Sequence, residues 1–114
     1  MHRAVFAFSV RSVHACLPLG AGPKVRPALV ISVPATDADR ALATLVPHTT
    51  SIRGSRFEAA VSVPFLKSGA FDAQNLITIP HAKLLRRLGT LNSEQLGNVE
   101  VAVRSWLGLS GHEA

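Results

Sequence analysis

The sequence predicts a mainly β domain, in which antiparallel strands form a sheet or a small barrel and one C-terminal helix closes the fold. Short apolar runs rich in branched side chains recur along the chain, and glycine- and proline-containing segments separate them. Near the C-terminus, apolar residues recur instead at helical spacing behind a capping sequence. Consecutive strands joined by short loops and followed by a helix argue for this architecture.

Five stretches of the chain are expected to supply the strands. Residues 5–17 form one long strand or two short ones, because apolar residues alternate there. Residues 28–33 form a buried strand, because branched apolar side chains follow one another. The other strands are expected at 41–46, 57–63 and 74–79.

The segments between these strands carry turn chemistry. Glycine and proline predict a loop at 18–23, and two aspartates suited to backbone capping predict a turn at 34–40. The polar residues 47–56 are a connection, and residues 64–69 form a short helical turn that ends at a glycine. Residues 81–88 are basic and are equally compatible with helix and strand.

The C-terminal helix has both of its ends marked in the sequence. Asn92 or Ser93 can cap its start, and Gln95 stands three residues after Asn92, as a capping box requires. Gly108 is expected to end the helix. The apolar face is expected to consist of Leu96, Val99, Val103 and Leu107.

The composition is that of one globular domain over residues 1–114. Hydrophobic residues make up 47% of the chain, which excludes a disordered class. The net charge of +5 and the pI of about 10.7 indicate a polyanionic partner such as nucleic acid, an anionic surface or an acidic protein. Many small domains are basic without binding RNA, so charge is supporting evidence only.

The cysteine count and the lengths of the apolar runs argue against disulfide-bonded, zinc-binding and membrane-spanning classes of protein. The single cysteine, Cys16, excludes an internal disulfide and is expected to be a core residue rather than a nucleophile. No Cys/His cluster has zinc-ligand spacing, so neither a metal nor another cofactor is expected. The apolar runs are too short to cross a bilayer, and polar residues interrupt the N-terminal run that resembles a secretion signal. A cytoplasmic protein is therefore expected.

Arg26 is the first candidate functional residue. It stands directly before Pro27, which lacks a donor and favours the first position of a strand. An arginine fork at a strand entrance suits a phosphate, and Arg26 with Lys24 would form a lip that stabilises the charge of a phosphorane-like transition state. A structural ion pair between Arg26 and an acidic residue is an equal alternative from position alone.

A second candidate site follows the predicted strand 41–46. An imidazole and three hydroxyls, those of His48, Thr49, Thr50 and Ser51, are expected to be exposed there. Hydroxyls can bind phosphate oxygens, and an imidazole can move protons near neutral pH. The alternative is ordinary loop capping beside a solvated histidine, and it is favoured when this segment is taken alone.

Three further groups of polar residues are candidates. Arg53 and Arg56 lie in a loop suited to a nucleic-acid backbone, with a solvated loop as the equal alternative. Asp72, Gln74 and Asn75 could read base edges or orient the arginine, or they could only form a turn. The basic cluster Lys83, Arg86 and Arg87 is interpreted as a surface with one packed side, with RNA or partner binding as the minority alternative.

Taken in order, these segments resemble the MazF/PemK family of toxin endoribonucleases. The resemblance runs from about Ser12 to Leu109 and leaves residues 1–11 poorly matched. Four blocks carry it: Lys24-Val25-Arg26-Pro27-Ala28-Leu29-Val30-Ile31-Ser32, Leu45-Val46-Pro47-His48-Thr49-Thr50, Gln74-Asn75-Leu76-Ile77-Thr78-Ile79 and Leu88-Gly89-Thr90-Leu91-Asn92-Ser93-Glu94-Gln95-Leu96. The first two blocks, at this separation and with the capped helix, are fairly specific.

The resemblance implies a small SH3-like barrel of antiparallel strands (CcdB/MazF-like) with a C-terminal helix, working as a homodimer. It also implies a type II toxin that cleaves single-stranded mRNA at specific sequences without a metal, by attack of the ribose 2′-hydroxyl on the adjacent phosphate. The family's arginine falls on Arg26, which would neutralise the phosphorane. Its threonine falls on Thr49, which would bind the phosphate or steer the attacking hydroxyl. The RNA-binding residues expected around them are Lys24, Thr50, Ser51, Arg53, Arg56, Asp72 and Gln74.

The sequence departs from the family pattern at its acidic positions. The loop at 18–25 has neither the acid nor the histidine that many members carry, and Ala73 stands where many have an aspartate. Asp72 lies one position earlier and is expected to point to the other face of a strand, unless a bulge re-aims it. His48 then becomes the replacement for the general base.

The rival function is a non-catalytic binding module of the same fold, either a CcdB-like gyrase poison or a degenerate toxin that acts in repression. The missing acids favour this alternative, and the intact Arg26 and Thr49 blocks argue against it. Under both hypotheses the expected partner is an antitoxin, whose acidic and initially disordered tail would fold into the basic cleft and cover Arg26.

Overall fold

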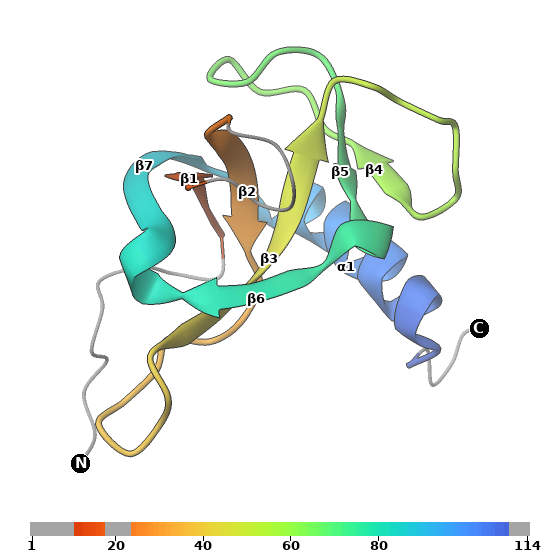
Figure 1. The fold of residues 1–114 in the computed structure, drawn as a ribbon. Helices are drawn as coiled ribbons and strands as arrows, with labels where there is room; N and C mark the ends of the chain where they lie inside the picture. Colours follow the sequence, from red (N-terminus) through yellow and green to blue (C-terminus); the bar gives the residue numbers. More distant parts are fainter. Residues whose placement is uncertain (1–10, 18–23, 110–114) are drawn as a thin grey trace.

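A curved antiparallel sheet with one helix against it forms the architecture of the computed structural model, which describes residues 11–17 and 24–109 (Figure 1). The strands are β1 (Ser12–Cys16), β2 (Arg26–Val30), β3 (Leu42–Thr49), β4 (Glu58–Ala60), β5 (Ala70–Asp72), β6 (Ile77–Pro80) and β7 (Leu84–Thr90). The helices are the short 3₁₀ turns η1 (Ala73–Asn75) and η2 (His81–Lys83) and the C-terminal helix α1 (Ser93–Leu107). The loop predicted at 18–23 and the first part of the strand predicted at 5–17 lie outside the described residues.

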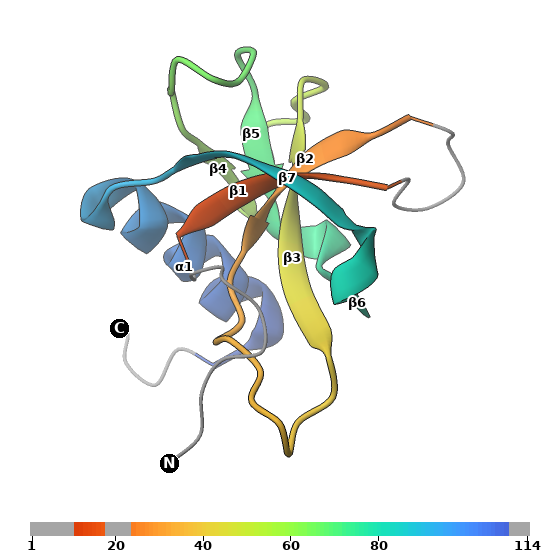
Figure 2. The ribbon, with the colours of Figure 1, turned by 90° about the vertical axis from the view of Figure 1, so that its left-hand side faces the viewer.

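The sheet is an open barrel in which all paired strands are antiparallel. The strand order is β4-β5-β3-β2-β1-β7, and β6 pairs with β3 beside this path. Within the described residues β4 and β7 end the order without pairing to each other, so the barrel does not close. Figure 2 shows α1 and β6 on opposite sides of the long strand β3. The predicted class, mainly β with a C-terminal helix, is confirmed.

Most predicted strands exist with shifted bounds. β2 begins at Arg26 instead of residue 28, so the arginine belongs to the strand itself. β3 continues past the predicted end to Thr49, because its last two residues pair with β5. β4 covers only the start of the predicted strand 57–63. Residues 64–69 form turns and bends instead of a helical turn, and residues 81–88 contain both alternatives, η2 followed by β7.

The strand predicted at 74–79 is confirmed only over residues 77–79, which belong to β6, because residues 74 and 75 lie in the turn η1. β5, η1 and β6 all run beside β3. His48 and Leu45 are three positions apart on β3, whereas their partners Phe71 and Ile77 are six positions apart. Three residues are therefore extra on this side, and the chain loops them out as η1.

Helix α1 has the predicted caps and most of the predicted buried face. Asn92 accepts a hydrogen bond from the Gln95 backbone N–H (2.8 Å), and the Gln95 side chain accepts one from the Asn92 N–H (2.9 Å), so the capping box is confirmed. Gly108 ends the helix with a φ of 69°, in the left-handed region. Leu107 was expected on the buried face but is 49% exposed, so this face ends at Val103.

Apolar side chains are buried on both faces of the sheet, because successive strand residues point to opposite faces. The cluster beside α1 includes Val13, Leu29, Val46, Phe71, Leu91 and Val99. The second cluster consists of Cys16, Ala28, Val30, Ala43, Leu45 and Ile79. Burial raises the pKa of the Cys16 thiol to about 11, so its predicted place in the core is confirmed. In the part of the chain that the structure describes, no helix is long and apolar enough to cross a membrane.

Candidate active site

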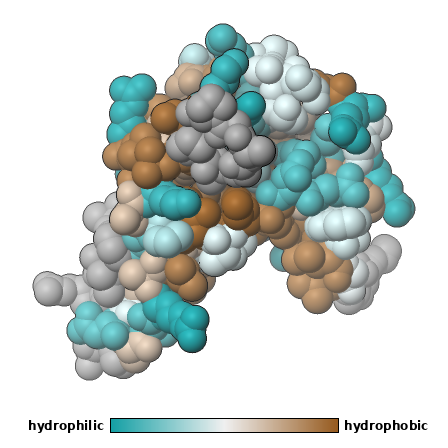
Figure 3. Space-filling view, viewed as in Figure 1, coloured by the Kyte–Doolittle hydropathy of each residue, from teal (hydrophilic) through white to brown (hydrophobic). Residues whose placement is uncertain are grey.

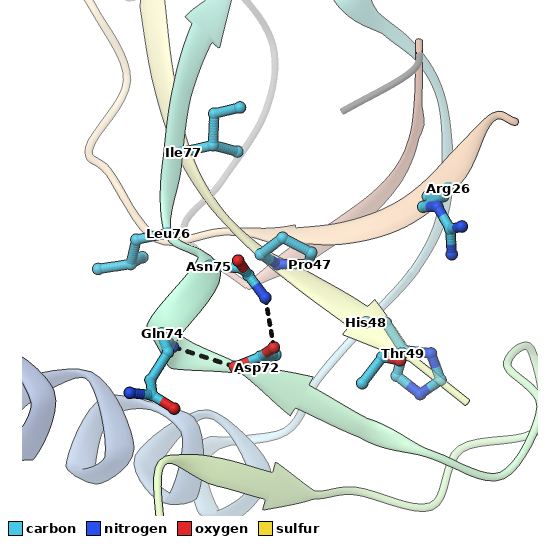
Figure 4. Close-up of a pocket in the computed structure, with 9 residues that line it drawn as sticks. All are labelled: Arg26, Pro47, His48, Thr49, Asp72, Gln74, Asn75, Leu76 and Ile77. Carbon is cyan, nitrogen blue, oxygen red and sulfur yellow. Dashed lines mark hydrogen bonds between the residues drawn. The ribbon is translucent and has the colours of Figure 1, made fainter. Parts of the chain in front are cut away.

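Two neighbouring strands carry Arg26 and Thr49 to the same region of the sheet. The ladder between β2 and β3 ends at the pair Ala28 and Pro47. Arg26 lies two positions before Ala28, and Thr49 lies two positions after Pro47, so both side chains are expected on the sheet face of that pair. Beyond this pair the strands diverge, and the space between them opens into a pocket (Figure 4).

Both residues line one pocket of about 450 Å³, within the range of roughly 300–1,000 Å³ that is typical of small-molecule sites (Figure 4). Strands β2 and β3 supply one side, which we call the ladder wall: Arg26, Pro47, His48 and Thr49. The chain from the end of β5 to the start of β6 supplies the other side, which we call the turn wall: Asp72, Gln74, Asn75, Leu76 and Ile77.

Arg26 gives the pocket an exposed positive charge. Its guanidinium makes no hydrogen bond or ion pair with any residue that the structure describes. The structural ion pair considered above is therefore not formed within this part of the chain. An unpaired guanidinium keeps its planar fork of donors available for an anion such as a phosphate.

Thr49 is prepared to donate a hydrogen bond. Its Oγ1 accepts a hydrogen bond from the Ser51 backbone N–H at 3.0 Å. A hydroxyl has one proton to give, and this contact leaves that proton unused. Thr49 can therefore donate a hydrogen bond to an anion held by Arg26. Arg26 and Thr49 thus both favour negative charge in the pocket.

Asp72 faces the pocket and organises the turn wall. Its Oδ1 accepts a hydrogen bond from the Gln74 backbone N–H at 3.1 Å, and its Oδ2 accepts one from the Asn75 side-chain amide (Figure 4). Asp72 is the last residue of β5, between the core residues Phe71 and Ala73, so strand alternation turns its side chain to the opposite face, where the pocket lies. The carboxylate therefore reaches the pocket without a bulge, whereas the side chain at Ala73 points into the core.

His48 is buried rather than exposed, contrary to the expectation. Its side chain is 4% exposed, and its ring packs edge-on against Phe71 with 5.1 Å between the ring centroids. Burial lowers the pKa of His48, so the imidazole is neutral at pH 7. Its Nε2 is buried and has no hydrogen-bond partner among the described residues.

Several residues predicted to bind RNA do not line the pocket. They are Lys24, Thr50, Ser51, Arg53 and Arg56. Arg56 instead stacks on the ring of Phe57 at 4.5 Å, and this ring contacts Trp106 of α1 at a centroid distance of 5.2 Å. The guanidinium of Arg56 thus belongs to a surface contact with the helix.

The loop that carries Arg53 is held by a neighbouring acidic residue. Glu58 accepts hydrogen bonds from the backbone N–H groups of Arg53, Gly54 and Ser55, at 2.8 to 3.2 Å. These bonds lower the pKa of the Glu58 carboxyl, and the bond from the Arg53 backbone has the largest effect. The loop is therefore ordered by its own carboxylate cap.

Sequence reasoning missed part of the turn wall. Asn75 was considered, but it was not selected as an RNA-binding residue, and the apolar lining by Pro47, Leu76 and Ile77 was not foreseen. An aspartate that caps the residue two positions later marks an Asx turn, and this signal in Asp72 could have corrected the predicted start of the strand.

In the face shown in Figure 3, apolar surface lies in the hollowed centre with hydrophilic residues beside it.

Other buried polar groups lie in β1, away from the pocket. His14 and Ser12 share a hydrogen bond of 3.0 Å, and burial, together with the positive charge of Arg87, lowers the pKa of His14.

Across residues 11–17 and 24–109, no three His, Cys, Asp or Glu side chains form a group that could hold a metal ion.

The fold and the pocket together define a small basic β domain, in which a pocket contains an unpaired arginine and a threonine hydroxyl from adjacent strands. A family model described as the PemK-like, MazF-like toxin of type II toxin–antitoxin systems matches residues 13–107. The chain belongs to this toxin family, as the resemblance implied.

Solved structures of MazF toxins share the fold. One is an endoribonuclease from a mycobacterial species in complex with its cognate antitoxin. It is 26% identical in sequence and has a TM-score of 0.77, and the match covers 90% of this chain and 97% of that chain. The Mycobacterium tuberculosis toxin MazF-mt6 is 27% identical with a TM-score of 0.73, over 87% of this chain and 98% of that chain. A MazE–MazF structure from Deinococcus radiodurans, 23% identical with a TM-score of 0.75 over 92% of this chain and 99% of that chain, shows the fold alone. Among curated proteins, none matches the sequence significantly.

Proposed function

We propose that this protein is a metal-independent, sequence-specific endoribonuclease that cleaves single-stranded mRNA in the cytoplasm as the toxin of a type II pair. The observation that carries the proposal is that the unpaired guanidinium of Arg26 and the unused hydroxyl proton of Thr49 line the same open pocket. Membership of the MazF-like family and the structural likeness to a mycobacterial endoribonuclease support it.

The proposed reaction is a transesterification at the RNA backbone. The ribose 2′-oxygen attacks the adjacent phosphorus and loses its proton, the bond from phosphorus to the 5′-oxygen breaks, and the 5′-oxygen gains a proton. The products are a 2′,3′-cyclic phosphate and a 5′-hydroxyl. Arg26 stabilises the extra negative charge of the phosphorane, and Thr49 donates a hydrogen bond to one of its oxygens. DNA lacks the attacking hydroxyl, so the mechanism selects RNA.

His48 as the acceptor of the 2′-proton stays a prediction. Its lowered pKa keeps the imidazole neutral and able to take a proton at pH 7, but its Nε2 is enclosed beside Phe71. In that role, the rate of cleavage should rise with pH through the lowered pKa of His48, and His48→Gln should remove this rise. An unchanged pH–rate profile in His48→Gln would show that His48 has only a packing role and does not accept the proton.

The proposed partner is an antitoxin with an acidic tail. The mycobacterial endoribonuclease that is 26% identical was solved in complex with its cognate antitoxin. The net charge of +5 and the open cation at Arg26 favour an acidic segment that covers the pocket. A saturated complex should have no RNase activity, and full cleavage by that complex would contradict this part of the proposal.

The test is cleavage of a single-stranded RNA pool by purified protein in EDTA. Arg26→Ala should slow cleavage by roughly 10²-fold or more, and Thr49→Val should slow it while Thr49→Ser retains the hydroxyl and most of the rate. Arg40→Ala is the matched control, because Arg40 is exposed and lies outside the pocket. Unchanged rates in both Arg26→Ala and Thr49→Val would show that the site assignment is wrong.

The same experiment separates the non-catalytic alternative. A binding module such as a gyrase poison would arrest growth with DNA damage while purified protein leaves RNA intact. The position of Ala73, where many family members have an acid, is the feature that favours this alternative. Cleavage that depends on Arg26 would exclude it.

A further inference from the structure

The hydrogen bond between Asp72 and Asn75 fixes which end of the asparagine amide is free. A carboxylate at neutral pH only accepts hydrogen bonds, so the amide must present its NH₂ group to Asp72 Oδ2. The Asn75 Oδ1 therefore points away from Asp72 (Figure 4). No described residue gives this oxygen a hydrogen bond, so it is an unused acceptor on an exposed side chain of the turn wall.

From this geometry we propose that Asn75 selects the base beside the cleaved phosphate. Its Oδ1 accepts a hydrogen bond from the exocyclic amino group at C6 of a purine or C4 of a pyrimidine, so adenine or cytosine is favoured. Guanine and uracil carry a keto oxygen at the same ring position and are disfavoured. Asp72 is the positioning residue that sets the orientation of the amide. This inference rests on the proposed RNA cleavage and adds the class of base to it.

The place of Asn75 relative to the phosphate site supports this role. Pro47 lies two positions before Thr49 on β3, about 7 Å along the strand and on the same face. Pro47 and Asn75 line the same pocket, whereas the Gln74 side chain points away from Arg26 (Figure 4). A nucleotide with its phosphate between Arg26 and Thr49 can therefore set its base against Pro47, within reach of Asn75.

The substitution Asp72→Asn tests the orientation directly. The backbone N–H of Gln74 still needs an acceptor, so the new amide must direct its oxygen to Gln74 and its NH₂ group to Asn75. Two NH₂ groups cannot bond to each other, so the Asn75 amide must rotate and offer its oxygen to position 72. The NH₂ group of Asn75 then faces the pocket, and the favoured base changes from adenine or cytosine to guanine or uracil, whose keto oxygen at C6 or C4 accepts this hydrogen bond.

The experiment maps the cut sites of the wild-type protein and three variants on a random single-stranded RNA pool. Wild type should prefer adenine or cytosine over guanine or uracil by roughly tenfold at one position next to the cut. Asp72→Asn should reverse this preference at the same position, and Asn75→Ala should flatten it. Asp39→Asn is the matched control, because Asp39 also caps a loop through the Thr36 N–H but lies outside the pocket, and its profile should equal that of wild type.

The outcomes separate this inference from the proposed function. An unchanged cut-site profile in Asp72→Asn or in Asn75→Ala would overturn the inference while cleavage itself stands. Loss of all cleavage by a folded Asp72→Asn protein, with its unfolding midpoint close to that of wild type, would also overturn it, because Asp72 would then act on the reaction. An absence of RNA cleavage by the wild-type protein would instead remove the proposed function.

Discussion

The two walls of the pocket are built in different ways. The ladder wall is carried by regular strands, and Arg26 and Thr49 lie two positions beyond the last β2–β3 pair, Ala28 and Pro47. The turn wall is built around η1, three residues looped out of register and held by the two hydrogen bonds of Asp72. Regular strands thus position the guanidinium of Arg26 and the hydroxyl of Thr49. The irregular turn instead exposes the Asn75 amide, whose orientation is set by its neighbour Asp72. We therefore expect the ladder wall to control the rate of cleavage and the turn wall to control its sequence.

The largest expected effect follows from substitutions of Arg26. Arg26→Ala should lower the cleavage rate by roughly 10²-fold or more at every site in the RNA pool, with the relative use of sites unchanged. Arg26→Lys should recover only part of the rate, because an ammonium keeps the charge and loses the planar fork. Rates at individual cut sites, measured in parallel, check both points. A changed site preference in Arg26→Ala would break the division between the two walls.

The next effect concerns the backbone behind Thr49. A Cβ added at Gly69 would lie 2.1 Å from the Thr49 carbonyl oxygen, so Gly69→Ala must displace the end of β3. We expect a loss of about 1–3 kcal/mol in the free energy of unfolding, measured by urea denaturation, together with a lower cleavage rate. Wild-type stability in this variant would show that the ladder wall tolerates movement.

Gly97→Ala is the matched control for that substitution. Gly97 is inside α1, and a Cβ added there would have no atom of the described residues within 4 Å, apart from its chain neighbours and the backbone of its own helix. The variant should gain about 0.5–1 kcal/mol in stability, because alanine is a better helix former than glycine, with no change in cleavage. Destabilisation by Gly97→Ala would mean that the Gly69 result reflects glycine replacement in general.

A smaller effect on stability is expected in the turn wall. Asp72→Ala removes the cap of η1 and should cost about 1 kcal/mol in the free energy of unfolding. Its cut-site profile should lose discrimination, since nothing then orients the Asn75 amide. Urea denaturation and cut-site mapping measure the two effects. A uniform loss of rate with an unchanged profile would assign Asp72 to the rate-controlling wall.

The smallest effect is a dependence of stability on pH that involves the ladder wall. Burial lowers the pKa values of His48 and His14 below the 6.5 expected in the unfolded chain, so the folded state binds fewer protons in acid. Stability should therefore be complete above about pH 6.5 and fall as the pH decreases below it. Urea midpoints at pH 7.5 and 5.5 measure this loss, and His48→Gln should reduce it. Equal midpoints at both pH values in wild type would contradict the burial of these imidazoles.

How far the sequence predicts the site also differs between the two walls. The ladder wall could be predicted, because Arg26 and Thr49 stand at the ends of adjacent apolar runs and strand pairing follows from those runs. The turn wall could not, because Leu76, Ile77 and Ile79 indicate a strand but do not show that the Asp72 cap replaces its predicted start at residue 74 with the turn η1. The burial of His48 was missed for a related reason: its packing against Phe71 depends on β3 extending to pair with β5, which the apolar pattern did not show.

The central claim is that the Arg26–Thr49 pocket promotes attack of a ribose 2′-hydroxyl on the neighbouring phosphate. The most direct measurement uses the RNA sequence that wild type cuts best, with a single 2′-deoxy nucleotide on the 5′ side of the cut, in EDTA. The account predicts that the all-ribose strand yields a 2′,3′-cyclic phosphate and a 5′-hydroxyl, and that the 2′-deoxy strand is not cut at that bond. Cleavage of the 2′-deoxy strand at the same bond would contradict it.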